Sequence, residues 1–128
     1  MGKKKKAFLE IEGIQNYPFP KSFVDFINKE PKADLEPWWF LVYKEGKINS
    51  WHKNLKQLYP KRALISFAKF SVNDDIACFD GEDLSGNPKV LIIHAYASEG
   101  WEHHSTFTDF NTWLSEALKT RDKWNEDE

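Results

Sequence analysis

The amino-acid sequence predicts an α+β domain, with a single, mostly antiparallel sheet flanked by an early helix and a C-terminal helix. Three observations predict this class. Five runs rich in β-branched and aromatic residues follow one another, a proline-led amphipathic segment precedes them, and the longest amphipathic segment follows them. A length of 128 residues suits one domain, which we place at residues 17–120. A loose lead-in at 1–16 precedes it and an acidic, frayed tail at 121–128 follows it.

The early helix is predicted at residues 21–29. Pro20 comes directly before this segment and suits the start of a helix, because proline is tolerated in the first turn. Phe23, Phe26 and Ile27 stand three and four positions apart, so they share one apolar face. The segment therefore has the pattern of a short helix that packs against a sheet.

The C-terminal helix is predicted at residues 106–119 and has the strongest periodicity in the chain. Thr106 or Thr108 can cap its start, because a threonine oxygen accepts hydrogen bonds from the first free N–H groups. One continuous stripe of large side chains follows the helical repeat. Its members are Phe107, Phe110, Trp113, Leu114 and Leu118.

The strands are predicted from short runs of aromatic and β-branched residues. Glu45 and Gly46 read as the turn between the first two runs, residues 54–59 as a helical turn, 81–88 as a turn and 97–105 as a loop. In chain order, the runs are residues 38–43, 48–51, 63–70, 75–80 and 89–96.

One cysteine and short apolar runs bound the location of the protein. Cys78 lies within an apolar run, which predicts a small buried residue rather than a reactive thiol. A chain that cannot form an internal disulfide fits a reducing compartment, so we expect a cytoplasmic protein. The apolar run at residues 90–93 is far shorter than the roughly 20 residues of a membrane-spanning helix, so we expect no membrane association.

Charge is distributed unevenly along the chain. Residues 1–70 contain 14 Lys or Arg and seven Asp or Glu, whereas residues 71–128 contain four and 13. Such asymmetry can steer a charged partner toward one face if folding keeps the acidic segments together. The net charge of −2 and the absence of a recognisable nucleic-acid-binding module argue against nucleic acid as the partner.

The residue patterns of common catalytic sites are absent from the sequence. It contains no GxSxG, P-loop, GxGxxG or HExxH motif, so we predict no catalytic residues, no cofactor and no metal. The turn that starts at Asp80 resembles a calcium loop, but Leu84 and Ser85 stand where an oxygen donor and a glycine are required. A metal-assisted hydrolase built from His94, His103 and Asp80 is an alternative, since zinc sites use scattered histidines.

Acidic residues and one loop tryptophan form the candidate binding surface. Trp101 follows a glycine in a polar loop, where it either stands exposed as an anchor or folds back onto the core. Carboxylates near both ends of the strand at residues 75–80 suit a basic partner. The predicted partner-binding residues are Asp74, Asp75, Asp80, Glu82, Asp83, Glu99, Trp101 and Glu102.

Five segments together have the pattern of a known family. They are FPKSFVDFINKE at residues 19–30, LISFAKF at 64–70, CFDG at 78–81, KVLIIHAY at 89–96 and the helix start at 105–114. These segments resemble the SUKH superfamily, the group of the yeast glucan-synthesis regulator and its bacterial relatives. The family's usual N-terminal helix is shortened here, and residues 29–34 replace its usual Gly-Gly. The resemblance implies a sheet flanked by helices and, for bacterial members, an immunity protein that neutralises a secreted toxin, often a nuclease.

Three functional hypotheses follow. The first is a non-catalytic protein-binding domain, most concretely an immunity protein that neutralises a secreted toxin, and we expect it to be a monomer or weak dimer. The second is a regulatory or scaffold domain that binds an endogenous protein or a small ligand. The third is the histidine-based hydrolase.

Overall fold

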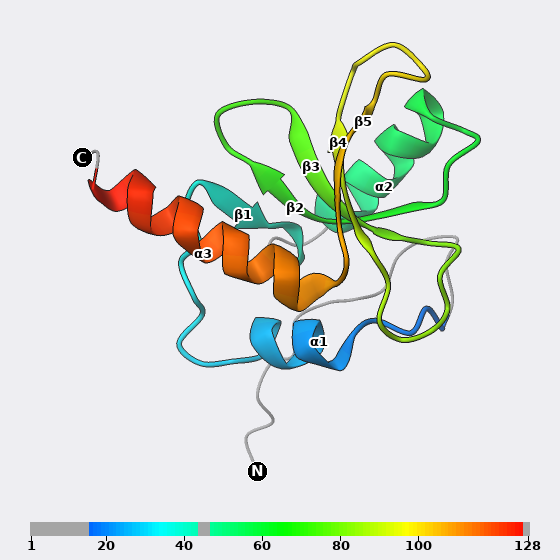
Figure 1. Cartoon of the computed structure of the whole chain (residues 1–128). Helices are drawn as coiled ribbons and strands as arrows, with labels where there is room; N and C mark the ends of the chain where they lie inside the picture. Colours follow the sequence, from blue (N-terminus) through cyan, green and yellow to red (C-terminus); the bar gives the residue numbers. More distant parts are fainter. Residues whose placement is uncertain (1–15, 44–46, 127–128) are drawn as a thin grey trace.

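The computed structural model describes residues 16–43 and 47–126 and has the predicted α+β architecture (Figure 1). Five strands form one sheet in the order β1-β2-β3-β4-β5, and each strand runs antiparallel to its neighbours. Its strands are β1 (Trp38–Phe40), β2 (Leu64–Phe70), β3 (Asp75–Asp80), β4 (Val90–His94) and β5 (His103–Phe107). Its helices are α1 (Lys21–Ile27), the 3-10 helix η1 (Leu41–Tyr43), α2 (Lys47–Leu58) and α3 (Phe110–Glu126).

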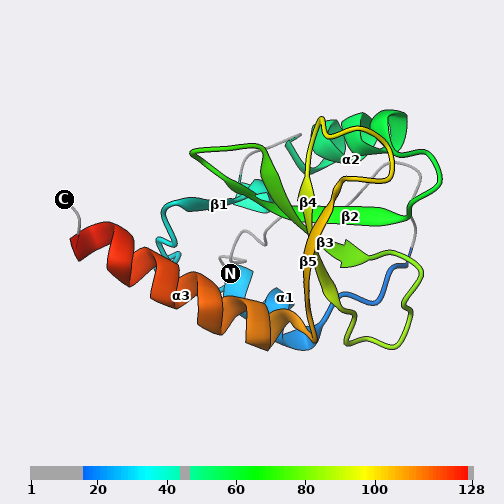
Figure 2. The ribbon, with the colours of Figure 1, turned by 45° about the horizontal axis from the view of Figure 1, so that its top comes forward.

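The sheet lies between two helical layers (Figure 2). One face packs against α1 and α3, and the other packs against α2. Side chains alternate between the two faces along a strand, so in β3 Ala77 and Phe79 face α1 and α3 while Ile76 and Cys78 face α2. All four side chains are fully buried, which explains why β3 reads as an unbroken apolar run rather than as an alternating one.

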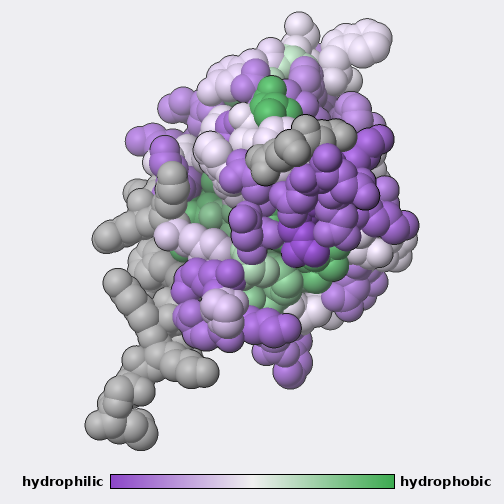
Figure 3. Space-filling model, turned by 90° about the vertical axis from the view of Figure 1, so that its left-hand side faces the viewer, coloured by the Kyte–Doolittle hydropathy of each residue, from purple (hydrophilic) through white to green (hydrophobic). Residues whose placement is uncertain are grey.

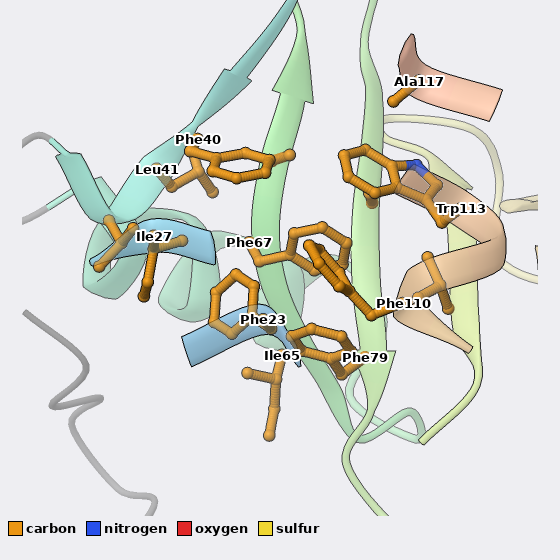
Figure 4. Packing of buried hydrophobic residues seen from close by; sticks show 14 of the residues in the cluster. Phe23, Ile27, Phe40, Leu41, Ile65, Phe67, Phe79, Phe110, Trp113 and Ala117 are labelled. Atoms are coloured by element: carbon orange, nitrogen blue, oxygen red, sulfur yellow. The ribbon is translucent and has the colours of Figure 1, made fainter. Parts of the chain in front are cut away.

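An aromatic cluster fills the layer between the sheet and the helices α1 and α3 (Figure 4). The rings of Phe67 and Phe79 stack with centroids 4.3 Å apart across β2 and β3. The ring of Phe23 meets that of Phe79 edge to face at 5.0 Å, and the ring of Trp113 meets that of Phe67 edge to face at 4.9 Å. These contacts tie both helices to the centre of the sheet, because aromatic pairs add to the stabilisation from buried area.

The chain between β1 and β2 differs from the prediction. The strand predicted at residues 48–51 is wrong, because this segment is the first part of α2. Ile48 and Leu55, seven positions apart, are both buried, which is the spacing of a helix face. The predicted strand at residues 38–43 is shorter than expected, since β1 ends at Phe40 and η1 follows. The predicted turn at Glu45 and Gly46 lies outside the described residues.

The strand β5 was not predicted: it spans the end of the predicted loop at residues 97–105 and the first two residues of the predicted helix at 106–119. The edge strand β5 begins at His103 and pairs with β4 across a bulge at His104. Four of its five residues are polar, so β5 lacks the apolar alternation by which strands are recognised. An edge strand needs few apolar side chains, because it is only partly covered by its neighbours.

The C-terminal helix begins later and ends later than predicted. Asp109 caps α3: its Oδ1 atom accepts hydrogen bonds of 2.8 Å from the backbone N–H and from the hydroxyl of Thr112. The predicted capping role of Thr106 or Thr108 is therefore wrong. The helix continues to Glu126, so residues 121–126 of the predicted tail are helical.

Further predictions concern Cys78, the membrane and the lead-in. Cys78 is a buried free thiol, as predicted, and burial raises the pKa of its thiol far above the usual value. Within residues 16–43 and 47–126, no helix is long and apolar enough to cross a membrane. The predicted lead-in at residues 1–16 lies outside the described residues except for Asn16.

Candidate protein-binding surface

Three large exposed apolar side chains, those of Val72, Tyr96 and Trp101, lie at one end of the sheet, whereas Leu84 lies at the other end. Among the described residues, the large exposed ones are Trp39, Val72, Leu84, Tyr96 and Trp101. Tyr96 and Trp101 belong to the connection between β4 and β5, residues 95–102, which we name the β4–β5 loop. Val72 belongs to the neighbouring β2–β3 turn. The two segments are joined by a hydrogen bond of 2.9 Å from the N–H of Ala95 to the backbone oxygen of Asp74. On the face shown in Figure 3, by contrast, hydrophilic side chains cover most of the surface.

Trp101 is 81% exposed, which makes it the most exposed large apolar side chain of the described structure. Of the two alternatives drawn from the sequence, the structure therefore has the exposed anchor and not the residue folded back onto the core. Tyr96 in the same loop is 59% exposed. Two exposed aromatic side chains in one short loop form an apolar surface, and such surfaces can mark a site of contact with another molecule.

The β4–β5 loop lies beside α2 (Figure 1). Side chains of that helix and of the residues after it form hydrogen bonds with the loop. The Tyr59 hydroxyl donates a hydrogen bond of 2.8 Å to the backbone oxygen of Ala97, and it lies 3.3 Å from the backbone oxygen of His94. The Asn54 side-chain amide donates a hydrogen bond of 2.9 Å to the Tyr96 hydroxyl. These bonds hold the first half of the loop in one conformation.

An ion pair between the buried carboxylate of Glu102 and the partly exposed side chain of Arg62 holds the second half of the loop. Glu102 is only 3% exposed, and its Oε2 atom accepts a hydrogen bond from Nε of Arg62. Its Oε1 atom accepts a hydrogen bond of 2.6 Å from the backbone N–H of Gly100. Burial opposes ionisation of Glu102, but these hydrogen bonds outweigh burial and hold the pKa of the carboxyl below its usual value.

Two residues of the loop have left-handed backbone conformations. Gly100 has φ of +98°, which glycine adopts without a steric penalty. Tyr96 has φ of +68°, which is uncommon for a bulky residue and persists only where surrounding contacts impose it. The loop is thus held in a defined shape, and that shape displays Tyr96 and Trp101 rather than burying them.

The predicted acidic surface is divided between two ends of the sheet. Asp75 of β3 pairs with His94 of β4, so the β2–β3 turn and the β4–β5 loop share one end. Asp80 stands at the opposite end of β3, about 17 Å away at the usual rise per strand residue. The first end carries Asp74, Asp75, Glu99, Trp101 and Glu102, and the second carries Asp80, Glu82 and Asp83.

Several predicted partner-binding residues have structural roles. Glu102 is buried, so its carboxylate is withdrawn from any contact surface. Asp75 accepts a 2.7 Å hydrogen bond from Nδ1 of His94. Asp80 and Asp83 accept backbone N–H groups within the β3–β4 turn at 3.0 Å. Asp74 and Glu99, at the same end as Trp101, are exposed, as is Glu82 at the other end.

The histidines do not assemble the hydrolase considered above. Asp80 lies at the far end of β3 from His94, and His103 donates to or accepts from the Thr106 hydroxyl at 2.7 Å. His104 follows His103 on the edge strand and is exposed. Across the part of the chain that the structure describes, no group of three or more His, Cys, Asp or Glu is placed to hold a metal ion.

Sequence reasoning missed the residues that fix the loop. Asn54, Tyr59 and Arg62 act over sequence separations of about 40 residues, and no local pattern links them to the loop. A comparison of the chain with protein-family models, curated proteins and solved structures gave no match.

Proposed function

We propose that this chain is a non-catalytic protein-binding domain and, most concretely, an immunity protein that neutralises a secreted toxin. The observation that carries the proposal is the β4–β5 loop, in which an ion pair and several hydrogen bonds hold an 81% exposed tryptophan outside the core. On this proposal the protein acts in the cytoplasm as a monomer or weak dimer.

Pre-organisation supports a binding role. A loop that is already ordered loses little conformational freedom when a partner covers it, so more of the contact energy appears as affinity. Tryptophan is among the residues that most often dominate binding energy, because it buries a large area with few rotatable bonds. Trp101 on a fastened loop combines both properties.

Charge and sequence resemblance favour a basic toxin as the partner. Asp74 and Glu99 lie at the same end as Trp101, and exposed carboxylates there would speed the approach of a basic protein such as a nuclease. The segments that resemble the SUKH superfamily point the same way, since bacterial members of that group neutralise toxins. The second candidate, a regulatory or scaffold domain with an endogenous partner, would use the same loop.

The test begins with the reading frame beside the gene of this chain. If it encodes a large secreted toxin, the affinity of the purified toxin domain is measured for the native chain, for Trp101→Ala and for the control Trp39→Ala. Trp39 is a half-exposed tryptophan on β1, at the opposite edge of the sheet from β5. We expect Trp101→Ala to weaken binding by at least about 30-fold, or roughly 2 kcal/mol, and to abolish protection of toxin-producing cells.

Two outcomes would contradict the proposal in different ways. Equal binding by the native chain and Trp101→Ala would move the interface away from the β4–β5 loop. A toxin that the native chain neither binds nor neutralises would reject the immunity role, and an endogenous partner that needs Trp101 would then support the regulatory candidate.

A further inference from the structure

We propose that a cavity beside α2 binds a small organic anion that has an apolar body. The cavity has a volume of about 790 Å³, which lies within the usual range of roughly 300–1,000 Å³ for small-molecule sites. It is bounded by α2, the start of β2, the chain before α1 and the β3–β4 turn, and the last three lie together on the right of Figure 1. This site is separate from the exposed tryptophan, and the proposal does not depend on the immunity role.

One face of α2 forms the polar wall of the cavity. Asn49, His52, Lys53 and Lys56 stand three, four and seven positions along the helix, so their side chains share one face. The buried side chains of Ile48 and Leu55 lie about a quarter of a turn away around the helix. The polar wall therefore borders the face of α2 that packs on the sheet.

The remainder of the lining supplies apolar surface. Leu55 and Leu64 are buried and contribute to the floor, and Leu84 of the β3–β4 turn is 68% exposed at the border. The ring of Tyr17 adds an aromatic wall. Its position is fixed because the Tyr17 hydroxyl donates a hydrogen bond of 2.8 Å to the backbone oxygen of Asp80. An apolar ligand body would cover the exposed Leu84 and shield the leucine floor from water.

The charge of the lining selects an anion. Among the described residues that line the cavity, Lys53, Lys56 and Arg62 are cationic and none is Asp or Glu. Glu102 compensates the charge of Arg62, whereas Lys53 and Lys56 form no ion pair within the described residues. Two ammonium groups one turn apart on a partly covered helix face match a carboxylate, sulfonate or phosphate group.

Other ionisable groups near the cavity decide on which side of it an anionic group would lie. Burial lowers the pKa of His52, whose Nδ1 atom lies 3.2 Å from the backbone oxygen of Leu64, so its imidazole is neutral at pH 7. Burial, and then the negative charges of Asp83 and Asp80, raise the pKa of Tyr17, so the wall at Tyr17 is unfavourable for an anion. The anionic group of a ligand would therefore lie on the α2 side of the cavity, beside Lys53 and Lys56.

A pair of fluorescent probes tests the proposal. The full-length chain is titrated with 8-anilinonaphthalene-1-sulfonate and with N-phenyl-1-naphthylamine, which has the same aromatic body without the sulfonate. The same titrations are made with the double variant Lys53→Gln/Lys56→Gln and with the control Lys119→Gln/Lys123→Gln, whose exposed lysines lie on α3. Circular dichroism verifies that each variant is folded.

We expect the native chain and the α3 control to bind the sulfonate at least about tenfold more tightly than the neutral probe. The α2 double variant should lose that preference while binding the neutral probe as before. Equal affinity for both probes, or a sulfonate preference that survives the α2 double variant, would overturn the proposal. Failure of the native chain to bind either probe would overturn it as well.

Discussion

Glu102 links the buried interior to the exposed tip of the β4–β5 loop. Its carboxylate joins Arg62 on one side and the N–H of Gly100 on the other, directly beside Trp101. Sequence reasoning assigned it to the contact surface as one of the carboxylates expected to meet a basic partner. Its burial instead makes it the support for the residue that we expect to make contact.

Replacement of Glu102 by glutamine should destabilise the fold by about 2 kcal/mol, less than for a fully buried pair because the side chain of Arg62 is one-third exposed. Chemical denaturation of Glu102→Gln measures the loss, and Glu99→Gln serves as the exposed control with little expected change. Equal stability of the two variants would show that the ion pair does not hold the loop.

The same carboxyl gives the stability of the protein a pH dependence. Because the pKa of Glu102 is lower in the folded chain than in the unfolded one, its contribution is present above the unfolded pKa. It is lost as the pH falls through the folded pKa. Denaturation curves across the acidic range should therefore show a smaller fall in stability for Glu102→Gln than for the native chain.

The Ser66 hydroxyl lowers the stability of the fold, whereas the Glu102 carboxylate raises it. Its hydroxyl is fully buried in β2 and has no hydrogen-bond partner among the described residues. An unpaired buried hydroxyl costs free energy, so Ser66→Ala should stabilise the fold by about 1 kcal/mol. Thermal unfolding checks this, and a lower melting temperature for Ser66→Ala would mean that the hydroxyl has a partner, such as a bound water.

At the scale of single elements, the start of α3 depends on one cap. Asp109→Ala removes the acceptor for the Thr112 N–H and should cost about 1 kcal/mol. Thr108→Ala, one residue earlier and exposed, should leave stability nearly unchanged. Denaturant unfolding of the two variants compares the structural cap with the cap expected from sequence, and a larger loss for Thr108→Ala would contradict the assignment.

Local patterns decide which elements could be predicted from sequence. β3 was predicted at its observed bounds, because its buried run is flanked by polar turns. At residues 48–51, a neighbouring turn signal and β-branched content favoured a strand, although Ile48 and Leu55 carry the helical spacing. β5 could not be recognised by periodicity, since an edge strand of mostly polar residues owes its conformation to pairing with β4.

The candidate site was predictable only in part for a related reason. The polar, glycine-preceded loop made Trp101 a candidate anchor, but the sequence left open whether its side chain is exposed or folds back onto the core. The structure places it in solvent. The ion pair of Arg62 with Glu102 joins residues 40 positions apart, and only the folded chain brings them together. The same holds for the division of the acidic residues, which the antiparallel connection of β3 and β4 decides.

At the scale of the whole molecule, charge is sorted between two ends of the sheet rather than gathered on one face. Among the described residues, only the end with the β4–β5 loop combines exposed carboxylates with exposed aromatic rings. Electrostatic attraction acts over about 10 Å at 0.1 M salt, so carboxylates about 17 Å away at the other end should contribute little. Carboxylates at the two ends of the sheet should therefore differ in their effect on the rate of association with a basic partner.

Charge reversal of one glutamate at each end of the sheet tests this difference. Glu99→Lys, beside Trp101, should slow association with a basic toxin domain several-fold at low salt, and added salt should reduce the difference. Glu82→Lys is the matched control, because it reverses one exposed glutamate at the opposite end. Stopped-flow association rates distinguish them, and an equal or larger effect of Glu82→Lys would place the partner at the β3–β4 turn.

The most direct measurement of the proposed binding surface is amide hydrogen exchange of the full chain with and without the toxin domain. We expect exchange to slow in residues 95–102 and in the adjoining β2–β3 turn, and to remain unchanged in the β3–β4 turn and along α2. Slowed exchange in the β3–β4 turn or α2 without any change in residues 95–102 would contradict the assignment of the β4–β5 loop as the contact surface.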